Sequence, residues 1–167
     1  METPDGRIVT ADDGCQRVEA VLREHLPALA ELADLRPVVE WQQVPTEEAL
    51  TAANVPAVAI TSPGLTEPPT RDIRGVNATW RIGVGIIDRG ADYQDTARRT
   101  RTWAALVRTV LLQHLAGDLV REVAWVGEEY ALRPESTSAR TLGAAAVALD
   151  VSVRTVTRLP GRHSKIC

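Results

Sequence analysis

An alternating stretch that runs directly into an amphipathic helix, at residues 76–115, most constrains what this chain can fold into. Apolar residues at every second position of its first part predict a strand with one buried face. Asp88-Arg89-Gly90 has the composition of a turn, in which Gly90 is free to take a positive φ. Asp92 then offers a side-chain oxygen to cap a helix that runs to about Leu115. The residues expected on the inner face of the strand are Ala78, Trp80, Ile82, Val84 and Ile86.

The helix that follows this strand has a single apolar stripe. Steps of three and four residues bring its apolar side chains to one side, while Arg98, Arg101 and Arg108 fall on the opposite side. A long strand that feeds a long amphipathic helix is typical of a packed α/β layer. The stripe consists of Tyr93, Ala97, Trp103, Ala104, Val107, Val110 and Leu111.

The rest of the chain predicts one more long helix and several strands. The helix is expected from a cap at Asp12 or Asp13 to about Leu35, and Pro27 should either end its first segment or kink it. Its inner stripe is expected to consist of Val18, Val21, Leu22, Leu26, Leu29 and Leu32. Further strands are expected at 38–44, 57–61, 120–130 and 140–156, with a short helical turn at 46–53.

These elements predict an α/β (α+β) fold. We expect a mixed, mainly antiparallel sheet of four to five strands with two main helices packed on it. A chain of 167 residues has the ordinary length of a single domain, so we expect residues 1–167 to fold as one.

Three segments are expected outside the regular core: an N-terminal arm at 1–11, a long mobile loop at 62–75 and a basic C-terminal tail at 157–167. The loop has three prolines and two glycines in fourteen residues, which argues against regular structure. Loops of this length inside a compact domain are usually functional or mobile. The alternative is a disordered hairpin tip.

The net charge of −3 argues against a dedicated nucleic-acid binder. The charges are nevertheless unevenly distributed. Residues 1–70 carry twelve acids and four bases, and residues 71–167 carry ten acids and fifteen bases. Either these charges intermingle on one surface, or the molecule has an acidic and a basic side. The second arrangement would suit head-to-tail contact between identical subunits.

The polar residues show no pattern typical of catalysis or metal binding. His25, His114 and His163 lie far apart in the sequence, so a dedicated zinc site is not expected. The adjacent residues Glu128 and Glu129 should point to opposite faces of a strand, unless a bulge intervenes, and so should not share a proton. The loop serines, Ser62, Ser136 and Ser138, have no base suggested by any motif. We therefore expect no catalytic residues, no cofactor and no metal.

Two further features bear on location and packing. No run approaches the roughly 18 apolar residues of a membrane span, so we expect no membrane contact and a protein that is cytosolic at synthesis. A disulfide between Cys15 and Cys167 is possible but nothing in the sequence supports it. Gly83 and Gly85 lie within the central strand, where small residues let a helix or a neighbouring subunit approach closely.

Four stretches of this sequence resemble the tail terminator (tail completion) proteins of tailed phages of actinobacteria, whose architecture is related to the lambda-type terminator. The similarity covers about residues 15–156 and is strongest over 76–150. The stretches are Trp80-Arg81-Ile82-Gly83-Val84-Gly85-Ile86-Ile87-Asp88-Arg89-Gly90-Ala91-Asp92-Tyr93, Leu111-Leu112-Gln113-His114, Trp125-Val126-Gly127-Glu128-Glu129-Tyr130 and Ala139-Arg140-Thr141-Leu142-Gly143.

This resemblance implies a structural virion protein of the tail and neck that assembles in the host cytoplasm. Its subunits would form a homo-oligomer, a six-membered ring that caps the tail tube and stops further tube polymerisation. The implied partners are the major tail tube protein and the head–tail connector protein. Genomic DNA would pass through the lumen without specific binding.

Two sets of residues are candidates for the contacts of such a ring. Subunit contacts are expected at Arg98, Arg101, Arg108, Glu128, Glu129 and Arg140, and a solvated helix face is the alternative for the three arginines of the helix. Contacts with the tube or the connector are expected at Leu65, Glu67, Arg71, Asp72 and Arg74. The long strand at 140–156 could also pair with a strand of another subunit.

Two other functions remain open from the sequence. One is a head–tail connector (stopper or adaptor) of the same neck region. The other is a cytosolic α/β ligand-binding domain or enzyme, which would require a concave pocket with convergent polar groups.

Overall fold

The computed structural model describes residues 10–43, 54–72, 75–117, 120–135 and 140–155. Its elements are α1 (Ala11–Leu32), β1 (Glu40–Gln43), β2 (Ala57–Leu65), β3 (Thr70–Asp72), β4 (Gly75–Asp88), α2 (Tyr93–His114), β5 (Val120–Pro134) and β6 (Thr141–Thr155). The strands form a six-stranded sheet in the order β1-β2-β4-β6-β5, and β3 pairs with β4 off this path. All neighbours are antiparallel except β1 and β2. The α+β fold with a mainly antiparallel sheet is confirmed, although the sheet has more strands than we predicted.

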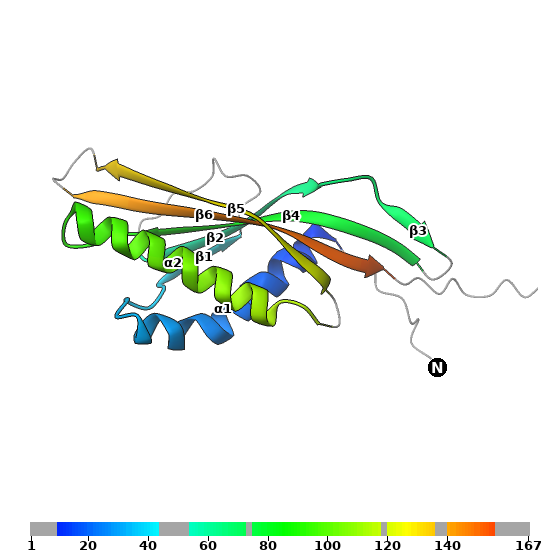
Figure 1. The fold of residues 1–167 in the computed structure, drawn as a ribbon, viewed down its shortest axis with the longest axis horizontal. Helices are drawn as coiled ribbons and strands as arrows, with labels where there is room; N and C mark the ends of the chain where they lie inside the picture. The colour runs from blue at the N-terminus through cyan, green and yellow to red at the C-terminus, as the bar shows by residue number, and fades with distance from the viewer. Residues whose placement is uncertain (1–9, 44–53, 73–74, 118–119, 136–139, 156–167) are drawn as a thin grey trace, which may run out of the picture.

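Both helices lie on the same face of the sheet (Figure 1). α1 packs on β2 and β4, α2 packs on β6, β4 and β5, and the two helices contact each other. The core between helices and sheet is fully buried at Val18, Leu22, Ile82, Trp103, Val107, Leu111 and Leu149, among others. Within the described ranges no helix covers the opposite face, which we call the open face.

The central strand and helix form as the sequence predicted. Ile82, Val84 and Ile86 of β4 are buried against the helices. Asp92 is the N-cap of α2, where its side chain accepts a hydrogen bond of 2.8 Å from the backbone N–H of Asp95. The predicted burial of Tyr93 is wrong, because that side chain is 62% exposed.

At this end of α2, Thr96 and Thr100 are the buried residues in place of Tyr93. They pack onto Gly143 of β6, where a Cβ, if one were present, would lie 2.0 Å from Thr100 Oγ1. The absence of a side chain at Gly143 therefore lets the helix approach the sheet closely. Small polar residues, rather than a bulky apolar one, fit that gap.

The first helix begins and ends differently from the prediction. Thr10 is the N-cap and Asp13 the third helical residue of a capping box, so Asp12 and Asp13 are not the cap. The helix does not end at Pro27 but continues to Leu32. Pro27 is exposed, so water can reach the backbone carbonyl that the proline leaves without a donor. Leu32 is 84% exposed, and Ala30 is buried in its place.

The predicted long loop at 62–75 is wrong for most of its length. β2 continues to Leu65 through a bulge between Thr61 and Gly64, and β3 pairs with the start of β4. Pro63 lies at this bulge, which tolerates a residue without an N–H. Between the two strands, the N–H of Thr66 still donates to the carbonyl of Thr79 at 3.0 Å. β3 and the adjoining end of β4 extend beyond the helices in Figure 1.

The long strand β6 is confirmed, but it lies inside the sheet. β4 pairs with it on one side and β5 on the other. Its predicted role in pairing with another subunit is therefore wrong over residues 143–153, because both of its edges are occupied there. The strand at the edge of the sheet is β5.

Several expectations fall outside the described residues. They concern the N-terminal arm before Thr10, the turn at 46–53, the loop serines Ser136 and Ser138, and the basic tail with His163 and Cys167. Arg74 also lies outside them. Among the described helices, none is both long enough and apolar enough to cross a membrane.

Candidate interaction surfaces

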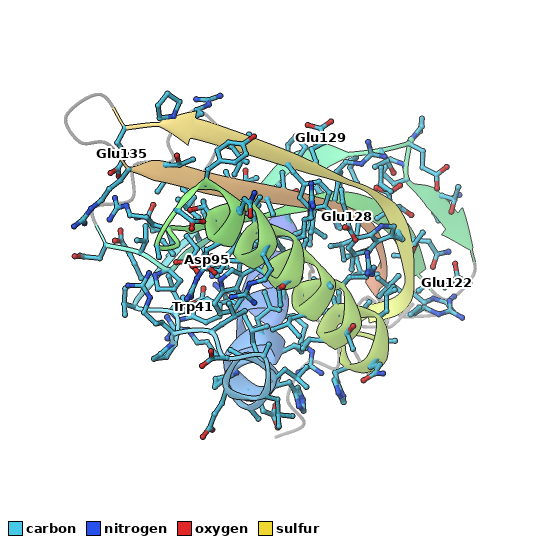
Figure 2. The ribbon with its side chains drawn as sticks, turned by 60° about the vertical axis from the view of Figure 1, so that its left-hand side comes forward. Trp41, Asp95, Glu122, Glu128, Glu129 and Glu135 are labelled. Atoms are coloured by element: carbon cyan, nitrogen blue, oxygen red, sulfur yellow. The ribbon has the colours of Figure 1, made fainter. Side chains whose placement is uncertain are left out.

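The contact between α2 and β5 brings together several residues that the sequence analysis selected. Arg108 Nη1 donates to Glu128 Oε1, and the hydroxyl of Tyr130 donates to the other oxygen of the same carboxylate. The Arg108 guanidinium also lies 5.9 Å from the centroid of the Trp125 ring. Figure 2 shows Glu128 on the side of β5 that faces α2. Glu128 is therefore satisfied within its own subunit.

These contacts determine the pKa of Tyr130 and which arginines of α2 form ion pairs. The hydrogen bond to Glu128, together with burial, raises the pKa of Tyr130, and the positive charges of Arg108 and, less strongly, Arg101 oppose the shift. Arg101 is exposed and forms no ion pair with any residue that the structure describes. Arg98, in contrast, pairs with Asp95 one turn away at 2.9 Å. Of the three arginines on this helix face, Arg101 is the one whose charge remains available to another molecule.

The other two residues of the predicted subunit contact lie elsewhere. Glu129 lies on the open face, on the opposite side of β5 from Glu128 (Figure 2), because its register partner is Ala146. The predicted opposition of the two glutamates therefore holds, although a bulge between Trp125 and Gly127 precedes them. Arg140 is exposed beside the end of β5, where its carbonyl accepts the N–H of Glu135 at 2.9 Å. The six residues thus belong to two different surfaces.

The residues predicted to contact the tube or the connector, apart from Arg74, gather at the end of the sheet farthest from α2's first turn. Leu65 is 43% exposed, and Glu67 and Arg71 are also exposed. The backbone of Asp72 pairs with Gly75 at the turn from β3 into β4. Thr79 Oγ1 donates to Glu67 Oε1 at 3.4 Å and lies 3.0 Å from Ser152 Oγ. A polar hollow of about 320 Å³ opens here between the β2–β3 connection and the ends of β4, β5 and β6.

The open face carries a bidentate ion pair surrounded by small residues. Arg81 Nε and Nη2 donate to the two oxygens of Asp150 at 2.8 and 3.2 Å. Gly83 and Gly85 lie beside this pair on the same face, in register with Ala148 and Ala146. No described helix packs against these glycines, so their contact with a neighbouring subunit stays a prediction.

A buried carboxylate that the sequence analysis missed lies where β4 ends. Asp88 is 1% exposed and accepts hydrogen bonds from Trp103 Nε1 at 2.8 Å, Arg36 Nη2 at 3.2 Å and the N–H of Arg89 at 2.7 Å. The only signal in the sequence was an aspartate directly after a strand. The two side chains that satisfy it come from segments far away in the chain, so this signal could not show its partners.

The first turn of α2 holds a second strongly bonded carboxylate. Asp95 accepts from Arg99 at 2.8 Å, from the N–H of Ala91 at 2.9 Å and from Arg98. These donors, Arg99 foremost, hold the pKa of Asp95 well below its ordinary value. The same bond raises the pKa of Arg99. This cluster fixes the turn between β4 and α2.

Two histidines that are distant in the sequence meet between the helices. The rings of His25 and His114 stack with centroids 3.8 Å apart and planes 9° from parallel. Within the described residues no group of three or more His, Cys, Asp or Glu side chains could hold a metal ion. The predicted place of His114 at the end of α2 is confirmed, and the stack itself was not foreseen.

The sheet order separates the acidic and basic parts of the sequence. Residues 10–43, which form α1 and β1, carry seven acids and three arginines. α2 carries one acid and four arginines. Because β1 and β5 are the two ends of the sheet order, α1 lies toward one edge and α2 toward the other. The two helices therefore differ in charge, whereas β5, the strand at the α2 edge, carries three acids and two arginines, so an acidic and a basic side of the whole molecule stays a prediction.

Comparisons with known proteins do not assign this chain to a family. No model of a protein family matches the sequence, and no curated protein matches it. Among solved structures, the chain is similar to a chain of the "Virion of native gene transfer agent (GTA) particle", with a TM-score of 0.40 and 13% sequence identity over 87% of this chain and 99% of that chain. A likeness of this size is too weak to support an argument about function.

Proposed function

We propose that this chain is a structural virion protein, the tail terminator of a tailed phage. Its subunits form a ring, expected to be a hexamer, that caps the last ring of the major tail tube protein. On its other side the ring meets the head–tail connector protein, and genomic DNA passes through the hole without specific binding. The protein would act in the tail and neck of the virion after assembly in the host cytoplasm, without catalysis and without a cofactor.

The observation that carries this proposal is the opposite charge of the two helices, which lie toward opposite edges of the sheet. A ring is built from heterologous contacts, in which one side of each subunit meets the other side of the next. Opposite charges on those two sides favour that contact and disfavour contact between like sides. The acidic α1 and the arginine-rich α2 support this arrangement.

The sequence resemblance gives separate support, because its four stretches belong to neighbouring elements. They fall on β4 with the start of α2, on the end of α2, on β5 and on the start of β6. These elements pack against one another as one continuous part of the fold. The resemblance therefore concerns a contiguous structural unit and not scattered segments.

Negative-stain imaging of the protein mixed with uncapped tail tubes tests the proposal. We expect rings with a central hole at tube ends, and tubes that stop growing once capped. Light scattering of the free protein would show whether the ring exists before the tube is added. Binding to purified connector with no effect on the tubes would instead favour a stopper or adaptor, and would overturn the terminator.

A further inference from the structure

The outer edge of β5 is a long strand edge that no described strand covers. β5 pairs with β6 on one side only, from Val120 to Pro134. Tyr130 is 50% exposed, and Glu129, Ala131 and Arg133 are exposed as well. An exposed edge of this length offers a row of unpaired backbone groups, which is a template for pairing with another chain.

The backbone groups that point away from β6 can be assigned from the end of the hairpin. The N–H of Glu135 donates to the carbonyl of Arg140, so these two residues form a hydrogen-bonded pair. Hydrogen-bonded and non-hydrogen-bonded pairs alternate in an antiparallel ladder. The outward backbone groups therefore belong to Glu128, Tyr130, Leu132 and Pro134. Pro134 occupies an outward position, where a missing N–H costs β5–β6 pairing nothing.

A regular part of this edge is bounded at both ends. The bulge between Trp125 and Gly127 ends it on one side, and Pro134, which cannot donate, ends it on the other. The straight segment from Gly127 to Glu135 has its midpoint at Ala131. A second copy that pairs antiparallel over the whole segment must therefore place Ala131 opposite Ala131.

The charges select the same register. With Ala131 on the two-fold axis, Glu129 of each copy lies opposite Arg133 of the other, on the open face. Neither Glu129 nor Arg133 forms an ion pair with any residue that the structure describes. In the same register, Tyr130 lies opposite Leu132, and their backbones exchange two hydrogen bonds. A register in which Tyr130 faces Tyr130 loses the charge pairing, and the next one along places Glu129 opposite Glu129.

We propose that two copies of this chain pair through the Gly127–Glu135 segment of β5, antiparallel and with Ala131 on the two-fold axis. The two sheets then form one continuous sheet, with all four helices on the same side. This pairing uses the β5 edge of both copies and so cannot extend into a ring. This role rests on the proposed terminator function: the dimer keeps unassembled subunits from closing into a ring, and binding of a subunit to the tail end replaces the dimer contact.

Disulfide trapping in the full chain tests the register. Ala131 is part of a non-hydrogen-bonded pair across the axis, where Cα atoms lie about 4.5 Å apart, within the range of a disulfide. In a Cys15→Ala, Cys167→Ser background, Ala131→Cys should give a covalent dimer on mild oxidation. Ala146→Cys is the matched control, because Ala146 is exposed on the same face but one strand farther from the axis. We expect it to stay unlinked.

Charge exchange tests the contact without any cysteine. Sedimentation of the wild-type protein should show a monomer–dimer equilibrium. Glu129→Arg and Arg133→Glu alone should each weaken it about tenfold, because the altered contact occurs twice in each pair. The double variant should restore it. Equal monomer content in Ala131→Cys and Ala146→Cys, or a double variant as weak as the single ones, would overturn the proposal. Neither readout uses tail tubes, so failure to cap tubes would bear on the proposed function alone.

Discussion

The indole N–H of Trp103 donates a hydrogen bond of 2.8 Å to the carboxylate of Asp88, where neither side chain is more than 1% exposed. Arg36 and the backbone of Arg89 supply the other donors. A buried carboxylate is tolerated only when it is hydrogen-bonded in this way. The contact joins the end of β4, the middle of α2 and the segment between α1 and β1.

Substitution Trp103→Phe should destabilise the protein by about 2–4 kcal/mol. It removes a donor from a buried charge and leaves a void where the larger ring was. The free energy of unfolding in urea, followed by circular dichroism, measures the effect. Trp125→Phe is the control, because Trp125 is only partly buried, and we expect it to cost less than about 1 kcal/mol. Equal losses would show that Asp88 does not depend on the indole.

Substitution Gly143→Ala should also destabilise the fold, by about 1–3 kcal/mol. A Cβ at this position would lie 2.0 Å from Thr100 Oγ1 and 2.9 Å from Thr96 Cγ2, so α2 would have to move away from β6. Gly127→Ala is the matched control on a strand, since a Cβ there meets no atom within 4 Å. Its midpoint of thermal unfolding should stay close to that of the wild type. A similar loss for both variants would mean that the close approach of α2 is unimportant.

Substitution Asp95→Asn should destabilise the protein in a pH-dependent way. The folded-state pKa of Asp95 is lowered from its ordinary value of 3.8, so its contribution to stability is fully present above that value. The contribution is lost as the pH falls further toward the folded-state pKa. Urea unfolding at pH 7 and near pH 3 should therefore show a smaller gap between wild type and variant at the lower pH. A constant gap would mean that the Asp95 charge is not what stabilises this turn.

The elements with one buried face could be predicted from the sequence. In β4, α2 and β6, burial of one face against a single layer imposes a period that the residues must follow. The sequence therefore predicted the order and type of these elements without knowledge of their contacts. Pattern alone failed at the ends of helices, in the last turn of α1 at Leu32 and in the first turn of α2 at Tyr93, where both side chains are exposed and Ala30 and Thr96 are buried instead.

The parts that depend on distant residues could not be predicted. Residues 62–65 and 70–72 have the composition of a loop, but pairing with β4 holds them as strands. The sequence selected Arg108 and Glu128 separately, and nothing local showed that they bond to each other. The same holds for the stack of His25 on His114. In each case the contact joins two segments that are distant in the sequence, and the periodicity of one segment carries no information about its partner.

Arg101 gives the sharpest test of the proposed ring. Its charge is exposed and unpaired within the described part of the chain, whereas reversal at Arg108 would also break its bond to Glu128. Arg101→Glu should leave the thermal midpoint unchanged and reduce capping of tail tubes, scored by negative-stain imaging, by about tenfold or more. Thr109→Glu adds a negative charge to another exposed position of α2 and should cap normally. Capping by Arg101→Glu at the wild-type level would show that the arginine face is solvated and forms no subunit contact.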